Sequence, residues 1–192
     1  MDRPRYPTFV SELPLTREAL DFAGARHRGQ RREADRAPFI LHPLEVAHLL
    51  RGRGLPDHVV AAGVLHDVIE DADVRPAELE LRFGPEVARL VAAVSEPVHD
   101  EPYAQRKALL REAVAGAERD AALIYAADKV ARARELRMGL VRSPAAGEPP
   151  PDRLEHYWAS LEMLERRLGD HPLVRQLRFE LETLALLPPG SV

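Results

Sequence analysis

Hydrophobic residues recur every three or four positions along most of the chain, and Pro and Gly separate the stretches that carry this spacing. Such spacing gathers apolar side chains on one face of an α-helix. Runs that alternate apolar and polar residues, as strands do, are short. The pattern therefore predicts an all-α chain, with helices expected over residues 16–29, 44–50, 57–71, 77–83, 85–94, 106–115, 121–141, 152–168 and 173–186.

Turn residues set the expected limits of these elements. We expect Thr16 to cap the first helix and Gly29 to end it. Residues 143–151 hold four prolines and one glycine, which predicts a loop inside one domain rather than a linker between two. A length of 192 residues suits a single domain. We therefore assign one domain to residues 16–187 and tails to residues 1–15 and 188–192.

Composition narrows the class of protein. No apolar run approaches the roughly 20 residues that cross a bilayer, and the first residues lack an apolar signal segment, so we expect a cytoplasmic protein without a membrane partner. A net charge of −4 provides no basic field for nucleic acid, so the expected partner is a small molecule. The chain has no cysteine, which leaves His, Asp and Glu as metal ligands. The sequence leaves open whether the chain forms a homo-oligomer.

A group of polar residues stands out in the helix expected over residues 57–71. At 3.6 residues per turn, one face of that helix carries an imidazole and three carboxylates, which belong to His66, Asp67, Glu70 and Asp71. Ionised carboxylates that lie so close repel one another, and a bound divalent cation relieves the repulsion. The alternative is a solvated acidic face with a stray histidine.

Two residues elsewhere strengthen the case for a metal. His42 lies just before an expected helix and precedes a proline, which restricts its backbone. Asp128 follows the apolar run 121–124 on a helix expected to be buried, and a buried carboxylate needs a cation or strong donors. An ion pair with Lys129 or Arg132 is the alternative explanation of Asp128.

These residues belong to an ordered set of motifs. Because of these motifs, the chain resembles the hydrolase domains of the RelA/SpoT homologues and the stand-alone small alarmone hydrolases of the metazoan SpoT-like type. The resemblance spans Ala19 to about Leu168. It rests on His27-Arg28-Gly29-Gln30-Arg31-Arg32, Pro38-Phe39-Ile40-Leu41-His42-Pro43-Leu44-Glu45-Val46-Ala47, His66-Asp67-Val68-Ile69-Glu70-Asp71, Phe83-Gly84, Ala127-Asp128-Lys129 and Arg134-Glu135-Leu136.

The resemblance implies an HD-domain helical bundle that uses a manganese ion to remove the 3′-pyrophosphate of guanosine tetra- or pentaphosphate, (p)ppGpp. The products would be GDP or GTP and pyrophosphate. By position, the implied metal ligands are His42, His66, Asp67 and Asp128. The implied catalytic pair, which orients the attacking water and handles its proton, is Glu70 and Asp71. Two imidazoles, carboxylate oxygens and water also suit Mn²⁺ better than a structural zinc site.

Candidate substrate contacts lie in the basic cluster after His27, on the helix of Asp128 and on the helix expected over residues 152–168. The residues are Arg31, Arg32, Arg132, Arg153 and Tyr157. An exposed basic turn is the alternative for the arginines of the cluster, and an aromatic residue at the edge of the core is the alternative for Tyr157.

Three substrate-side positions depart from the family pattern. Glu33 stands where the family has a lysine, Arg132 stands where it has an asparagine, and a common lysine is replaced near Tyr125. Arg132 either pairs with Asp128 or Glu33 and braces the site, or grips an additional phosphate of the substrate. We favour the phosphate.

We therefore expect a stand-alone enzyme that degrades the alarmone and does not make it, because the chain ends soon after the hydrolase region. One rival is a phosphohydrolase of another nucleotide, such as the adenosine alarmone (p)ppApp or NADPH. Another is a catalytically inactive nucleotide-binding sensor. The histidines without matching partners are expected at the surface, and they are His48, His58, His99, His156 and His171.

Overall fold

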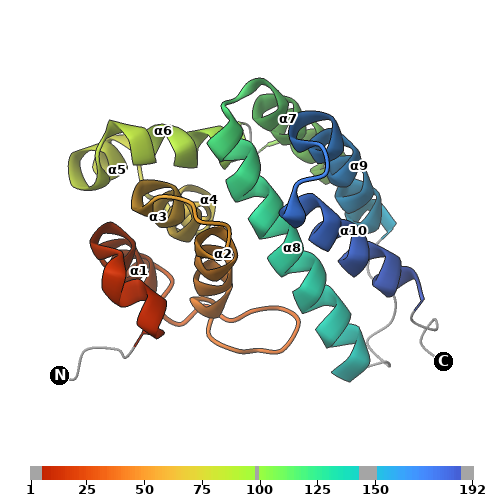
Figure 1. Ribbon diagram of the computed structural model, residues 1–192, viewed down its shortest axis with the longest axis horizontal. Helices are drawn as coiled ribbons and strands as arrows, with labels where there is room; N and C mark the ends of the chain where they lie inside the picture. The colour runs from red at the N-terminus through yellow and green to blue at the C-terminus, as the bar shows by residue number, and fades with distance from the viewer. Residues whose placement is uncertain (1–5, 98–99, 143–150, 187–192) are drawn as a thin grey trace.

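A computed structural model describes residues 6–97, 100–142 and 151–186, and its regular structure is helical (Figure 1). Within these residues an isolated antiparallel bridge pairs Arg31 with Pro38. The expectation of an all-α, single-domain chain is confirmed. In chain order the elements are the 3₁₀-helix η1 (Thr8–Glu12) and the α-helices α1 (Pro14–Arg26), α2 (Leu41–Arg51), α3 (Asp57–Leu65), α4 (Val68–Ala72), α5 (Pro76–Phe83), α6 (Pro85–Val94), α7 (Tyr103–Gly116), α8 (Arg119–Arg142), α9 (Pro151–Leu168) and α10 (Pro172–Ala185).

Helix α8 forms the axis of the molecule. It runs between the α1 to α6 group on one side and α7, α9 and α10 on the other (Figure 1). Its segment 121–131 is buried throughout, since apolar and mostly small side chains cover every face of the helix. Asp128 lies in this segment and is 6% exposed. The fold therefore carries a carboxylate into the core, where it needs partners.

The single helix predicted over residues 57–71 is interrupted, so that prediction was wrong. Helix α3 ends at Leu65 and α4 begins at Val68. The ring of His66 donates from Nδ1 to the carbonyl of Gly63 at 2.7 Å. In a continuous helix that carbonyl would accept from the backbone N–H of Asp67, so the side chain competes with the helical bond. His66 and Asp67 keep right-handed helical dihedral angles.

The start of α1 also differs from the prediction. Thr16 does not cap it, because the helix begins at Pro14 and Thr16 lies in its first turn. The cap comes from Asp57 at the start of α3, whose carboxylate accepts the backbone N–H groups of Leu15 and Thr16 at 2.9 Å each. The hydroxyl of Thr16 donates to the same carboxylate at 2.6 Å. A carboxylate 41 residues away thus does what a local cap was expected to do.

Other expected boundaries shift by a few residues. Helix α1 ends at Arg26 rather than near Gly29, and α2 begins at Leu41, so His42 lies in its first turn instead of before it. The segment assigned to an N-terminal tail contributes Val10 and Leu13 to the core. The domain limits themselves stay a prediction. Most of the loop expected over residues 143–151 and the tail at 188–192 lie outside the described residues.

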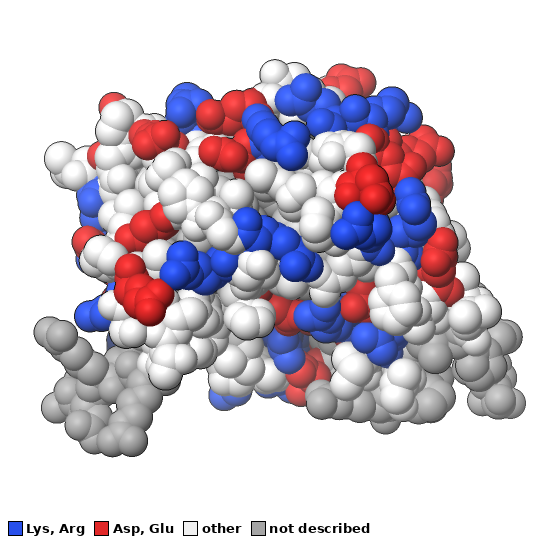
Figure 2. Space-filling model, in the orientation of Figure 1, with Lys and Arg blue, Asp and Glu red and all other residues white. Residues whose placement is uncertain are grey.

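The described helices lack the combination of length and apolar character that a membrane crossing requires. On the face shown in Figure 2, basic and acidic side chains are interspersed. Such a mixture gives no extended field of one sign on that face. The expectation that nucleic acid is not a partner stays a prediction.

Candidate active site

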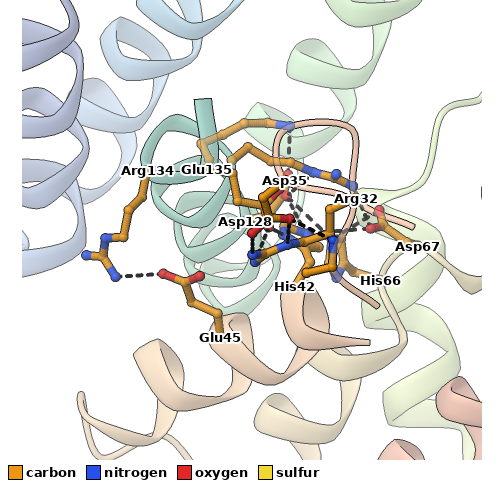
Figure 3. A network of polar contacts seen from close by, with 12 residues as sticks. Arg32, Asp35, His42, Glu45, His66, Asp67, Asp128, Arg134 and Glu135 are labelled. Carbon is orange, nitrogen blue, oxygen red and sulfur yellow. Dashed lines mark hydrogen bonds and ion pairs between the residues drawn. The ribbon is translucent and has the colours of Figure 1, made fainter. Parts of the chain in front are cut away.

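Four side chains from three parts of the fold converge on one point in the core (Figure 3). Nε2 of His42, from α2, lies 3.3 Å from Nε2 of His66, at the α3–α4 junction. Oδ1 of Asp128, from α8, lies 3.2 Å and 3.4 Å from these two nitrogens. Asp67 places Oδ1 3.1 Å from the His66 nitrogen and Oδ2 3.6 Å from that of His42. Neighbouring ligand atoms around a cation with bonds of about 2.1 Å are separated by about 3.0–3.4 Å. The spacing fits one ion.

Hydrogen bonds fix the tautomer of both imidazoles. Nδ1 of His66 faces the Gly63 carbonyl, which can only accept, so Nδ1 carries the proton. Nδ1 of His42 lies 3.1 Å from Oε1 of Glu135, and a carboxylate also accepts. With Nδ1 as the donor, each ring can present an unprotonated Nε2 to a cation at the cluster. A carboxylate or carbonyl behind each ligating histidine is typical of metal sites.

The carboxylate of Asp128 is divided between two roles. Oδ2 accepts from the ammonium of Lys129 at 2.7 Å. Oδ1 is buried and has no hydrogen-bond partner, although buried polar atoms in proteins are nearly always paired. A cation at the convergence point would satisfy this oxygen. Of the described residues, His42, His66 and Asp128 also form a group of three buried side chains whose ligand atoms lie within 4.8 Å of one another.

The pKa values of the cluster show how strongly its charges interact. Burial alone would lower the pKa of His66, but the carboxylates of Asp67 and Asp128 outweigh burial and raise that pKa to about 10. Burial would raise the pKa of Asp128, yet Lys129 and the two histidines hold it well below its usual range. The proton on His66 and the carboxylates thus compensate each other. A divalent cation would replace that proton, so the residues fit a metal.

The two predicted catalytic acids lie beside the cluster. Glu70 accepts the backbone N–H of Glu96 at 2.7 Å with one carboxylate oxygen, which leaves the second oxygen outside that bond. Asp71 follows in the same helix, and its backbone carbonyl accepts from the side chain of Gln30 at 2.8 Å. Burial is the main cause that raises the pKa of both carboxyl groups, and the neighbouring Asp67 raises both further.

A cavity of about 230 Å³ opens over this cluster. His66, Asp67 and Asp128 line it together with Glu70 and Asp71. Its other walls supply four cations and several aromatic rings from α7, α8 and α9. These residues are Lys107, Lys129, Arg132, Arg153, Tyr103, His156 and Tyr157. The cavity therefore combines carboxylates with cations and aromatic rings, as a phosphorylated nucleotide requires.

The structure places some of the predicted substrate contacts on the cavity wall and others away from it. Arg132, Arg153 and Tyr157 line the cavity, whereas Arg31 and Arg32 do not. Arg32 pairs with Asp35 and lies 3.3 Å from the Glu135 carboxylate, behind the His42 ring (Figure 3).

Arg132 pairs mainly with Asp67, a partner that the sequence did not suggest, and more distantly with Asp128, which it did. Its guanidinium donates to Oδ2 of Asp67 at 2.8 Å, and its Nε lies 3.5 Å from Oδ1 of Asp128. The structure shows no bond between Arg132 and Glu33, because Glu33 pairs with Arg153. Arg132 thus braces two carboxylates of the site, while its position on the cavity wall keeps it within the proposed substrate site.

Sequence reasoning missed several residues of the site, among them Tyr103 on the cavity wall. Glu135 stood in a matched segment but had no assigned role. Lys107 lines the cavity and pairs with the buried Glu96, and no spacing connected it to the motifs. His156 was expected at the surface, and that prediction was wrong, because it is 4% exposed and accepts from Arg111 through Nδ1 at 2.7 Å. Among the other histidines of this set, His48 is exposed, His58 and His171 are half-buried, and His99 lies outside the described residues.

Comparisons with known proteins agree with this geometry. The HD domain family matches residues 19–144. The human guanosine-3′,5′-bis(diphosphate) 3′-pyrophosphohydrolase MESH1 is 40% identical over 129 residues, which are 66% of this chain and 72% of the human protein. The Xenopus tropicalis protein of the same name is 35% identical over 130 residues, with the same two shares.

Solved structures give the same relationship. A metazoan ortholog of SpoT, described as hydrolysing ppGpp and playing a role in starvation responses, superposes with a TM-score of 0.74 at 27% identity. The match covers 96% of this chain and 100% of that one. The crystal structure of lmo0812 from Listeria monocytogenes EGD-e superposes with a TM-score of 0.66 at 27% identity, over 74% of this chain and 92% of that one. The chain belongs to the HD-domain family and, within it, to the hydrolases of the RelA/SpoT homologues.

Proposed function

We propose that the protein is a manganese-dependent (p)ppGpp hydrolase that releases pyrophosphate from the 3′ position and leaves GDP or GTP. The observation that carries this proposal is the convergence of His42, His66, Asp67 and Asp128 at the base of a cavity that Glu70 and Asp71 also line. The relatives that carry the name of this activity support the same choice of substrate.

The residues present would hold the metal through two imidazole nitrogens and two carboxylate oxygens. Manganese suits this set, because it accepts mixed nitrogen and oxygen ligands and leaves room for water. When bound, the cation supplies Lewis acidity, which lowers the pKa of water and stabilises charge on phosphate oxygens. The buried side chains of α8 around Asp128 limit its movement and so help to orient its carboxylate toward the ion.

Glu70 and Asp71 would orient the attacking water and move its proton. Glu70 is fixed by its bond to the Glu96 backbone, and its second oxygen is the one we assign to the water proton. Asp71 lies on the adjacent position of the same short helix, on the cavity wall. Two acids beyond the metal ligands are more than a nucleotide-binding sensor needs, which favours an enzyme.

The cations and aromatic rings of the cavity wall would hold the phosphates and the base. Arg132 and Arg153 present guanidinium groups, which bind phosphate in a bidentate manner. Tyr157 is 7% exposed on the cavity wall and offers an aromatic face to a base or a sugar. This placement supports these three residues as substrate contacts, and it does not support Arg31 and Arg32, which lie outside the cavity wall.

A panel of nucleotides incubated with Mn²⁺ tests the proposal. The panel holds guanosine tetraphosphate, its adenosine counterpart, NADPH and guanosine 5′-diphosphate, and free pyrophosphate and phosphate are measured separately. We expect pyrophosphate from the guanosine tetraphosphate at the highest kcat/KM. Phosphate release from NADPH, or faster turnover of the adenosine compound, would select a rival substrate. Binding of the tetraphosphate without any release would select the sensor.

A further inference from the structure

Every cation that lines the described cavity wall already has a carboxylate partner. A polyanionic substrate that binds there must therefore take a cation away from an existing ion pair. The pairs are Lys107 with Glu96, Lys129 with Asp128 at 2.7 Å, Arg132 with Asp67 at 2.8 Å and Arg153 with Glu33 at 3.1 Å.

These carboxylates differ in what happens when they lose their cation. Glu96, Asp128 and Asp67 are 8%, 6% and 9% exposed, so little water would reach the charge that each of them keeps in the core after losing this cation. Such a charge is costly. The side chain of Glu33 is 82% exposed, and water solvates its carboxylate as soon as the pair opens. Arg153 is therefore the cation that a phosphate can take over most easily.

The position of the pair makes it relevant to substrate entry. Glu33 lies in the loop between α1 and α2, and Arg153 lies in the first turn of α9, 120 residues later. Both residues line the cavity, and the Arg153 side chain is 35% exposed. The pair thus joins two distant segments at the solvent-exposed edge of the cavity. The Glu33 carboxylate therefore binds the Arg153 guanidinium, which is the group that we propose as a substrate contact.

We propose that Glu33 is a specificity-determining residue that competes with the substrate for Arg153. A phosphate that reaches Arg153 replaces the Glu33 carboxylate, which moves into water. A ligand with no anionic group at this end leaves the ion pair closed and gains nothing from Arg153. Glu33 therefore weakens the binding of every ligand that uses Arg153 and leaves the chemical step alone. This inference rests on the proposed function, since it takes Arg153 as a substrate contact.

The test compares Glu33→Gln in the natural chain and in an Arg153→Gln background. In the natural chain we expect Glu33→Gln to lower KM for guanosine tetraphosphate about 3- to 10-fold with kcat nearly unchanged, because uniform binding improves. In the Arg153→Gln background the same substitution should change KM less than 2-fold, since the residue for which Glu33 competes is gone. An equal decrease in both backgrounds would show plain repulsion between Glu33 and the substrate, and would overturn the proposal.

Asp152→Asn is the matched control. Asp152 is an exposed acid next to Arg153, and its carboxylate accepts the backbone N–H of Arg153 at 2.9 Å rather than bonding to the guanidinium. The Asp152→Asn substitution removes one negative charge close to Arg153, as Glu33→Gln does, but leaves the Glu33 carboxylate in place. We expect a small change in KM that is alike in both Arg153 backgrounds. A change as large as that of Glu33→Gln, and equally dependent on Arg153, would contradict the special role of Glu33.

A binding measurement separates this proposal from the proposed function. Calorimetric titration of the same variants with inorganic pyrophosphate needs no turnover, and Glu33→Gln should tighten the binding only where Arg153 is present. If guanosine tetraphosphate is not hydrolysed but this dependence appears, the proposed function fails and the role of Glu33 stands. If the tetraphosphate is hydrolysed while Glu33→Gln changes neither KM nor pyrophosphate binding, only the role of Glu33 fails.

Discussion

A carboxylate oxygen of Glu135 lies 3.1 Å from Nδ1 of His42, the ring nitrogen that faces away from the proposed metal ligands. The two residues are 93 positions apart, and α2 and α8 bring them together. The bond fixes the His42 tautomer and the direction of its free nitrogen. Glu135 is itself 10% exposed at the side chain and lies 3.3 Å from Arg32, so its charge is held in place.

We expect Glu135→Ala to lower the affinity for Mn²⁺ by about 10- to 100-fold, because carboxylates behind ligating histidines contribute that much at other metal sites. Glu45→Ala is the control. Glu45 lies on α2, as His42 does, but its carboxylate pairs with Arg134 and not with a metal ligand. Calorimetric titration with Mn²⁺ measures both. Equal affinities for the two variants would mean that packing alone orients His42.

Removal of the metal should abolish hydrolysis. The ligand set contains two histidines, two aspartates and no cysteine, which favours Mn²⁺ over Zn²⁺. After exhaustive chelation we therefore expect no pyrophosphate release, and we expect Mn²⁺ to restore more activity than Zn²⁺ at equal free concentration. Activity that persists in the fully chelated protein, with elemental analysis showing no ion, would contradict a metal-dependent mechanism.

The division between ligands and catalysts predicts two kinds of loss. Asp67→Ala and Asp128→Ala should lose bound metal, because each removes an oxygen that lies within 3.1–3.4 Å of a histidine nitrogen. Glu70→Gln should keep the metal and lose most turnover, on the order of 10²- to 10⁴-fold for a lost general base. Metal content by elemental analysis beside kcat distinguishes the two. A metal-free Glu70→Gln protein would place Glu70 among the ligands.

Local spacing in the sequence predicts which candidate site residues lie together, but it does not predict the residues that support them. Four of these residues lie within six positions, so helical spacing alone brings them together and no knowledge of the tertiary fold is needed. They are His66, Asp67, Glu70 and Asp71. Glu135 and His156 act through contacts 93 and 45 positions away, and no local pattern encodes them. The break in the helix after Leu65 was also not predictable, because hydrophobic periodicity carries no information about the hydrogen bond from the His66 ring to the Gly63 carbonyl.

Gly63 should not tolerate a side chain. A Cβ at this position would overlap Cδ1 of Leu50 and would lie 3.3 Å from Cγ1 of Val46, where α3 packs against α2. Gly63→Ala should lower the free energy of unfolding by about 1–3 kcal/mol, as overpacking of a core does. Gly116→Ala is the control, because nothing lies within 4 Å of its Cβ and alanine suits a helix better than glycine. Urea denaturation measures both, and equal stability of the two variants would mean that α2 and α3 move apart freely.

His156 should make the protein sensitive to acid. Burial and the nearby Lys129, Lys107 and Arg111 lower the pKa of His156 to about 2. Arg111 can only donate, so Nδ1 of His156 must accept and the folded protein keeps the ring neutral.

The unfolded chain behaves differently, since its His156 takes up a proton near the ordinary pKa of about 6.5. Below that pH the unfolded state binds more protons than the folded state, so stability falls as the pH decreases from about 6.5 toward 2. Between pH 7 and pH 5 this single group should cost about 2 kcal/mol. His156→Gln should show a smaller loss over the same interval, whatever its stability at pH 7. Urea denaturation of both proteins at the two pH values gives the comparison, and identical losses would mean that His156 becomes protonated in the folded protein.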